Sequence, residues 1–173
     1  MSGYNSGQQR PQQRQGGANT RQAGNAGINS GGQASAESNV NIYSPEFDIV
    51  AHAEKVISRL QRDKYDDSKI NLTTTQMRKF LSAVNLLNNK VMIYRVQNQD
   101  TNKLSAELVA EVRYLKIKLA YQSGREATVK DFAIKSSLEK AITDIGDSMS
   151  KYNKFSKYVE ALVAYRKYAG GDK

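Results

Sequence analysis

The sequence predicts an all-α protein, a five-helix bundle preceded by a disordered N-terminal tail. From residue 44 onward, apolar residues recur at three- and four-residue intervals, which is the period of amphipathic helices. Serine, threonine and glycine stand between these periodic segments, where caps and helix stops are expected. No segment shows the alternation typical of a half-buried strand. Together these observations favour helices that pack around one core.

The N-terminal region differs from the rest of the chain in composition. Its first 40 positions hold eight of the 12 glycines, and Gln and Asn fill 12 of the other 32 positions. Ile28 is the only large aliphatic residue between Ser2 and Asn39, so the region has too little apolar surface to offset the entropy lost on ordering. We therefore divide the 173-residue chain into a disordered tail, residues 1–43, and a helical bundle domain, residues 44–173.

The first helix is predicted from its starting signal. Ser44 supplies an N-cap, and Pro45 takes the first helical position, where its missing N–H costs nothing. We expect this helix to run to about Arg62, before a polar loop over residues 63–71. Helical spacing places four apolar residues on its inner side: Phe47, Val50, Ile57 and Leu60.

The second and third helices have the clearest patterns. Thr73 and Gln76 have the spacing of a capping box, which opens a long helix that ends near Gln97. The third helix is expected to stop at Gly124, because glycine tolerates the left-handed conformation found past helix ends. Their inward residues are predicted to be Met77, Phe80, Leu81, Val84, Leu87, Val91 and Tyr94 on one helix, and Leu104, Leu108, Val112, Leu115 and Leu119 on the other.

Two further helices complete the predicted bundle. The fourth opens at Thr128 and ends at Gly146, and the fifth runs from about Ser148 to Gly170 and Gly171. Their apolar residues again recur at helical intervals: Phe132, Leu138, Ile142 and Ile145, then Tyr152, Phe155, Val159, Leu162 and Val163.

A second stripe runs beside the apolar stripe of the third helix. It contains Tyr114, Lys118, Tyr121 and Arg125, which span an arc of roughly 60° at about 100° per residue. Aromatic rings and cations in a row suit a phosphate backbone, and the fork of Arg125 suits bidentate contact with phosphate. In the alternative interpretation, the tyrosines border the core and Lys118 covers them. Two nearby cations are predicted to extend the row: Lys116 and Lys130.

Two other helices offer candidate contacts. Arg78 and Lys79 lie early in the second helix, whose free N-terminal amides attract anions, so this helix start is a candidate phosphate site. In the alternative interpretation, the threonines there only cap the helix and the two cations are solvated. On the last helix an outward face is predicted, with lysines that suit phosphates and tyrosines that suit a protein interface or stacking on bases. These residues are Lys154, Lys157, Tyr158, Tyr165 and Tyr168.

Composition narrows the classes of function. The net charge is +9, and residues 1–40 supply only +2 of it, so the helical domain favours polyanions. The chain has no cysteine, no apolar signal core and no 18-residue apolar run, which predicts a cytoplasmic protein without a membrane span. The single histidine, His52, lacks catalytic partners, and the polar loop with Asp63, Asp66 and Asp67 implies no fixed metal geometry. We predict no catalytic activity, no metal and no cofactor.

Three segments resemble a known family. Tyr114–Glu126, Tyr158–Gly171 and Leu72–Phe80 occur in family order and resemble the small helical subunit of type III-A CRISPR effector (Csm) complexes. The resemblance implies a noncatalytic RNA-binding subunit in antiviral defence. Its partners would be CRISPR RNA, target RNA, the backbone and large subunits, and further copies of itself. The N-terminal tail departs from the family pattern. Two rival interpretations stay open: a helical protein–protein scaffold without RNA contact, and a metal-dependent hydrolase.

Overall fold

The structure, a computed structural model, describes residues 40–170. Within this range the chain forms six helices and no strand: α1 (Ile49–Ser58), α2 (Thr74–Gln97), α3 (Ala106–Arg125), α4 (Ala127–Lys135), α5 (Leu138–Ile145) and α6 (Met149–Tyr168). The predicted all-α class is confirmed, and the predicted number of five helices is one too low. The predicted tail lies, up to residue 39, outside the described residues.

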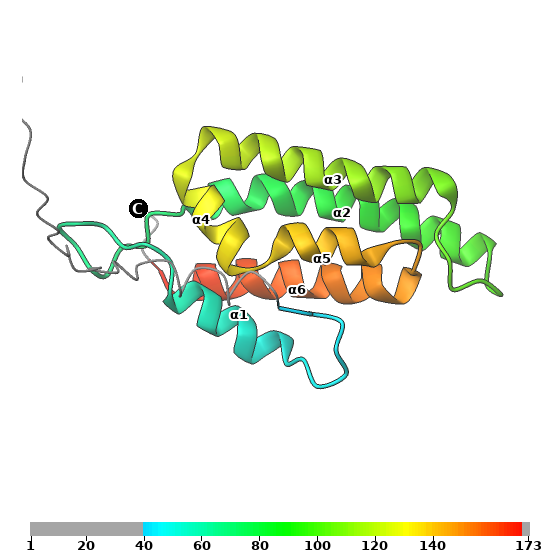
Figure 1. Cartoon of the computed structure of the whole chain (residues 1–173), viewed down its shortest axis with the longest axis horizontal. Helices are drawn as coiled ribbons and strands as arrows, with labels where there is room; N and C mark the ends of the chain where they lie inside the picture. The colour runs from blue at the N-terminus through cyan, green and yellow to red at the C-terminus, as the bar shows by residue number, and fades with distance from the viewer. Residues whose placement is uncertain (1–39, 171–173) are drawn as a thin grey trace, which may run out of the picture. The chain divides into compact units, whose positions relative to one another are not determined.

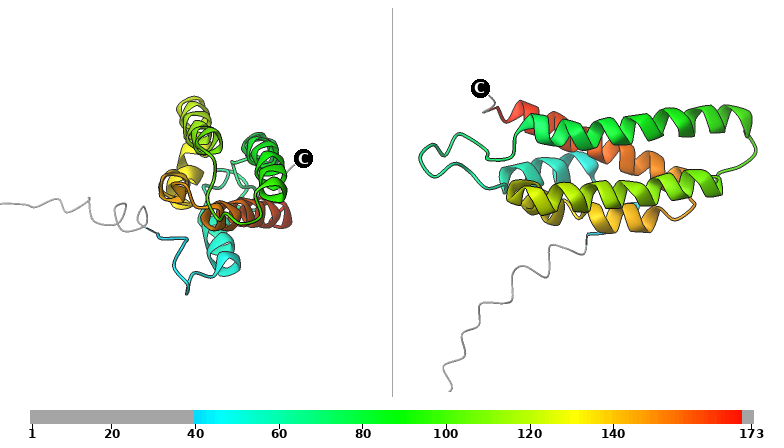
Figure 2. Two further views of the ribbon diagram at one scale, coloured as in Figure 1. Left: turned by 90° about the vertical axis from the view of Figure 1, so that its right-hand side faces the viewer. Right: turned by 90° about the horizontal axis from the view of Figure 1, so that it is seen from above.

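Four helices surround the core, and the other two complete the fold. Each of α2, α3, α5 and α6 packs against two of the others, so that in the end-on view they form a ring (Figure 1, Figure 2). Helix α1 packs along the outside of α6, and α4 joins α3 to α5. None of these helices, all between residues 40 and 170, is long and apolar enough to span a membrane.

The predicted apolar stripes of α2, α3 and α6 form the core. The four predicted leucine and valine positions within α3 are buried, and so is Leu104 just before it. Phe80 and Val84 of α2 and Tyr152 and Phe155 of α6 are buried as well. Helix α1 departs from prediction, because Val50 is 54% exposed and Ala53 and Val56 take the inward positions. Burial of these stripes supplies the main stabilisation, at about 25 cal/mol per Å² of apolar surface.

The first helix starts later than predicted. Asp48, and not Ser44, caps α1, since its carboxylate accepts hydrogen bonds from the N–H groups of Val50 and Ala51 at 2.8 and 3.0 Å. The residues before it also pack on the core: Ile42 is 1% exposed, and the Tyr43 hydroxyl donates to the Ala141 carbonyl at 2.6 Å. Ordered packing therefore begins a few residues before the predicted boundary at residue 44.

The fourth predicted helix is two helices. Ser136 and Ser137 separate α4 from α5, and Ser137 adopts a left-handed conformation with φ of 52°. The Ser136 hydroxyl donates to the Phe132 carbonyl at 2.6 Å, an alternative to regular helix hydrogen bonding that serine offers readily. Gly124 was expected past the end of α3 but lies inside its last turn, so Arg125 is the final residue of that helix.

Candidate nucleic-acid interface

Helices α2 and α3 lie antiparallel and are positioned by caps and one ion pair. The capping box of α2 is present: the Gln76 N–H donates to the Thr73 hydroxyl at 3.2 Å, and the Thr73 N–H donates to the Gln76 side chain at 2.9 Å. Midway along the pair, Lys90 and Glu111 form an ion pair at 2.6 Å, and the hydrogen bond raises the pKa of Lys90. This register brings the start of α2 beside the end of α3.

Two predicted contact regions meet at that end. Lys79 of α2 and Tyr121, Gln122 and Arg125 of α3 line one open cleft of about 160 Å³. The sequence separates Lys79 from Arg125 by more than 40 positions, and only the pairing of the helices brings them together. Arg78 is also exposed at the start of α2 but does not line this cleft.

The tyrosines of the α3 stripe are open to solvent and carry cations over their rings. Tyr114 is 51% exposed with the Lys118 ammonium 5.2 Å from its ring centroid. Tyr121 is 64% exposed with the Arg125 guanidinium 5.7 Å from its ring centroid, and Arg125 also donates to the Tyr121 hydroxyl at 3.3 Å. Since both rings are more than half exposed, the alternative in which these tyrosines border the core does not describe them well.

Helix α2 adds residues that sequence reasoning missed. It holds four basic residues and no acidic one. Leu86 and Ile93 are 60% and 61% exposed, and with Lys79 and Lys90 they form a stripe along the α3 side of the helix. The seven-residue spacing from Lys79 to Leu86 to Ile93 could have indicated this stripe, because it places the three residues on one side of the helix. We call the combined surface the α2–α3 face: Lys79, Leu86, Lys90, Ile93, Tyr114, Lys118, Tyr121 and Arg125.

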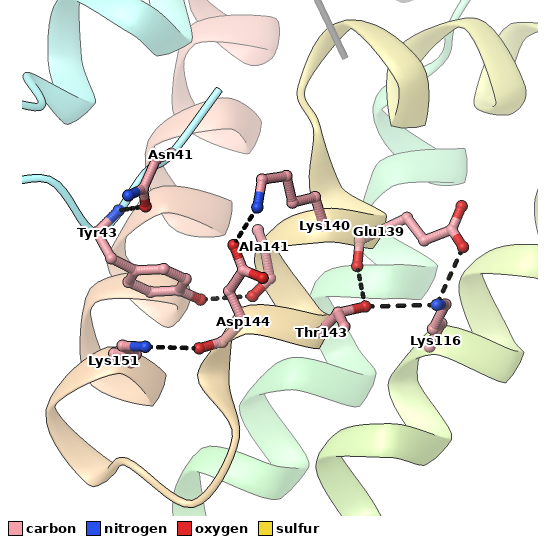
Figure 3. Close-up of polar contacts among 9 residues, drawn as sticks. All are labelled: Asn41, Tyr43, Lys116, Glu139, Lys140, Ala141, Thr143, Asp144 and Lys151. Carbon is pink, nitrogen blue, oxygen red and sulfur yellow. Dashed lines mark hydrogen bonds and ion pairs between the residues drawn. The ribbon is translucent and has the colours of Figure 1, made fainter. Parts of the chain in front are cut away.

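Lys116 and Lys130 lie away from this face. Both line a groove of about 560 Å³ between α3, α4 and α5. Lys116 pairs with Glu139 at 3.1 Å and donates to the Thr143 hydroxyl at 3.3 Å, so its ammonium is turned toward α5 (Figure 3). These two lysines therefore do not extend the stripe as predicted, and they belong to a separate surface on the other flank of α3.

The predicted outward face of α6 is largely wrong. Tyr158 is fully buried, donates to the Ser136 carbonyl at 3.0 Å and lies 2.9 Å from Nδ1 of His52, because α1 covers this side of α6. Tyr165 packs partly against the core. Lys154 donates to the Ser44 carbonyl at 2.8 Å. Only Lys157 and Tyr168 of this set are exposed, Tyr168 at 88%.

The residues considered for catalysis have structural roles. The Tyr158 hydroxyl donates a hydrogen bond to the Ser136 carbonyl, so its oxygen accepts a hydrogen bond from Nδ1–H of His52. Burial, and then the charges of Lys55 and Arg59, lower the pKa of His52. In the polar loop, Asp63 and Asp66 accept hydrogen bonds from the loop itself. Among residues 40–170 no group of three or more His, Cys, Asp or Glu side chains is arranged to hold a metal.

The fold and the α2–α3 face define a small, basic, all-α protein with an open two-helix surface suited to a polyanion. Comparison with known proteins gives the family. The family described as "Csm2 Type III-A" matches residues 47–172, beginning just after the predicted tail. The chain belongs to this Csm2 family of type III-A CRISPR systems, and the resemblance found in the sequence is confirmed.

Several relatives carry the name "CRISPR system Cms protein Csm2". The relative from Streptococcus thermophilus is 36% identical over 122 residues, or 70% of this chain and 91% of the relative. That from Mycobacterium tuberculosis is 39% identical over 122 residues, 70% of this chain and 90% of the relative. The relative from Enterococcus italicus is 37% identical over 99 residues, which cover 56% of this chain and 67% of the relative.

Proposed function

We propose that this Csm2 family member is a noncatalytic subunit of a cytoplasmic type III-A effector complex. It binds the sugar–phosphate backbone of the CRISPR RNA and its target RNA, and it supports assembly with the backbone subunits, the large subunit and further copies of itself. The α2–α3 face is the observation that carries this proposal, because it gathers Lys79, Lys118 and Arg125 beside exposed aromatic rings.

The chemistry of the face favours backbone contact over reading of sequence. Ammonium and guanidinium groups bind phosphates of any sequence, and phosphate contacts position a strand without specifying its bases. Lys90 pairs with Glu111, which leaves Lys79, Lys118 and Arg125 as the main cations of the face. The groove lysines Lys116 and Lys130 belong to another surface and are secondary candidates.

A protein-only scaffold is the second candidate, and one observation favours it. Leu86, Ile93 and Ile117 are each about 60% exposed on or beside the same face. Exposed apolar side chains on neighbouring helices are typical of surfaces that contact another protein. A scaffold would lose assembly when this face is altered, whereas an RNA track would lose target retention and keep assembly.

The test is a triple variant, Lys79→Ala, Lys118→Ala and Arg125→Ala, in the assembled effector complex. Target-RNA retention is measured across a salt series with two unrelated matched pairs of guide and target. Each lost phosphate contact should lower the salt slope by roughly 0.7–0.9, so the triple variant should lower it by roughly 2–3 with both pairs.

The comparison variant is Lys157→Ala with Lys167→Ala, two exposed lysines on α6, and it also tests the prediction that Lys157 contacts RNA. It should leave the salt slope of retention unchanged. Co-purification of the other subunits is measured for every variant. An unchanged salt slope in the triple variant refutes the proposal that RNA follows the α2–α3 face. Failure of the triple variant to join the complex supports the scaffold. A reduced salt slope in the α6 variant would show that the RNA contacts α6.

A further inference from the structure

Residues 61–71 between α1 and α2 form a rigid finger. This segment projects beyond the ends of the helices, at the end of the bundle where α2 begins and α3 ends (Figure 1, Figure 2). Its two sides are joined by backbone hydrogen bonds, from Asp63 to Lys69 at 2.7 Å and from Asn71 to Gln61 at 2.9 Å. The chain reversal is therefore held by the backbone itself.

The tip of the finger is fixed by its own side chains. Asp63 accepts from the N–H groups of Tyr65 and Asp66 at 2.9 and 3.1 Å. Arg62 reaches across the finger to the Asp67 carbonyl at 2.6 Å. These bonds account for the aspartate cluster as a structural feature and hold the backbone of Tyr65 in place without help from a ligand.

The base of the finger is anchored to the last helix. Arg166 of α6 is fully buried and donates to the Leu72 carbonyl at 2.6 Å and the Ile70 carbonyl at 3.3 Å. Ile70 and Leu72 are themselves buried. The finger is thus locked at both ends of its length, so a contact at its tip avoids most of the entropy loss of ordering a loop.

This finger presents one ring to solvent. Tyr65 is 90% exposed, and the Lys64 ammonium lies 5.7 Å from its ring centroid. Its neighbours in the tip are charged or polar, with no apolar side chain among residues 61–69 besides Tyr65. A tyrosine that anchors a protein contact is normally surrounded by packed residues that exclude water. Stacking on a nucleobase needs only the open ring face, so the surroundings favour a base.

We propose that Tyr65 stacks on an unpaired nucleobase of the RNA strand whose phosphates lie on the α2–α3 face. This inference rests on the proposed function and adds a base contact to it. The finger leads directly into α2, whose Lys79 lines the cleft with Arg125 at the same end of the bundle. Three cations and three aspartates cancel within residues 61–71, so the finger contributes stacking and no net attraction to phosphate.

The neutral charge of the finger gives the test its selectivity. With the purified full chain, Tyr65→Ala should weaken binding of a single-stranded oligouridylate by roughly 5- to 150-fold, the range of one base–aromatic stack. The salt slope should stay as in the wild type, because no phosphate contact is lost. Tyr65→Phe should bind as the wild type does. Affinity for a blunt RNA duplex, which offers no unpaired internal base, should be the same in all three proteins.

A spectroscopic measurement tests the contact without relying on affinity. The chain has no tryptophan, so Tyr65→Trp introduces a single reporter whose fluorescence a stacked base quenches. Val96→Trp is the matched control, since Val96 is 71% exposed near the far end of α2. Oligouridylate should quench the tryptophan emission of the Tyr65→Trp variant and leave that of the control unchanged.

The possible outcomes separate the two proposals. Two results would overturn the stacking inference: equal quenching in both reporters, or a loss of oligouridylate affinity below about twofold for Tyr65→Ala. The proposed function would still stand if Lys79→Ala with Arg125→Ala lowers the salt slope. A loss of co-purifying subunits with unchanged RNA affinity identifies the tip as a protein contact and also overturns it. If the wild-type chain and the assembled complex show no salt-dependent RNA binding through this face, both proposals are wrong.

Discussion

Tyr158→Phe tests the correction that matters most for the interpretation of α6. The substitution keeps the ring, which is fully buried, and removes only the hydroxyl. That hydroxyl donates to the Ser136 carbonyl at 3.0 Å and accepts from His52 at 2.9 Å. Its buried position also raises the pKa of Tyr158, so the group is a neutral donor at all physiological pH values.

The magnitude follows from these two hydrogen bonds. One hydrogen bond contributes about 1 kcal/mol net, and a buried group left without its partner costs about 1–3 kcal/mol. Because the ring remains, no cavity forms, and we expect a total loss of about 1–3 kcal/mol in the free energy of unfolding. For a domain of this size the melting midpoint should fall by about 4–12 °C.

Urea unfolding followed by far-UV circular dichroism measures this loss directly, and the transition slope should stay constant. Tyr168→Phe is the control, because Tyr168 is 88% exposed and its change should stay within about 0.5 kcal/mol. Equal effects at both positions would show that the buried network contributes nothing. Normal stability of Tyr158→Phe together with loss from the complex would restore the prediction that Tyr158 is an interface residue.

Two further predictions concern the core and pH. Leu115 is 3% exposed in the α3 stripe, so Leu115→Ala should lower the free energy of unfolding in urea by about 2–5 kcal/mol. Lys118→Ala should change it by no more than about 0.5 kcal/mol. Equal losses would mean that the faces of α3 are misassigned. The folded-state pKa of His52 lies below its usual 6.5, mainly because the ring is partly buried. This favours the neutral ring in the folded state, so its contribution to stability should be complete above pH 6.5 and lost as the pH falls through the lowered pKa. His52→Gln should flatten stability against pH in that range, and an unchanged profile would contradict the assignment.

Local patterns determined much of this protein. The capping box of Thr73 and Gln76, the apolar stripes of α2 and α3 and the stop at Gly146, which has a φ of 57°, all appear as predicted. These features depend on residues within one or two helical turns of each other, so a single sequence contains the information. The stripe from Tyr114 to Arg125 was likewise identified from spacing alone, because its members share one helix.

Tertiary contacts decided the features that sequence reasoning missed. A helical wheel predicted one buried stripe for α6, but α6 packs against α1, α2 and α5, so its buried arc is wider and takes in Tyr158 and Arg166. At the break between α4 and α5, the Ser136 carbonyl accepts a hydrogen bond from Tyr158, which is 22 positions away in the chain.

The α2–α3 face and the finger have the same origin. Lys79 and Arg125 share a cleft only because the two helices pair antiparallel, and the finger is anchored only because Arg166 reaches it from a helix more than 90 positions later. The sequence alone determined which side chains each helix carries and on which side. The packing of helices determined which of those sides were covered and which met, because burial depends on partners that are distant in the chain.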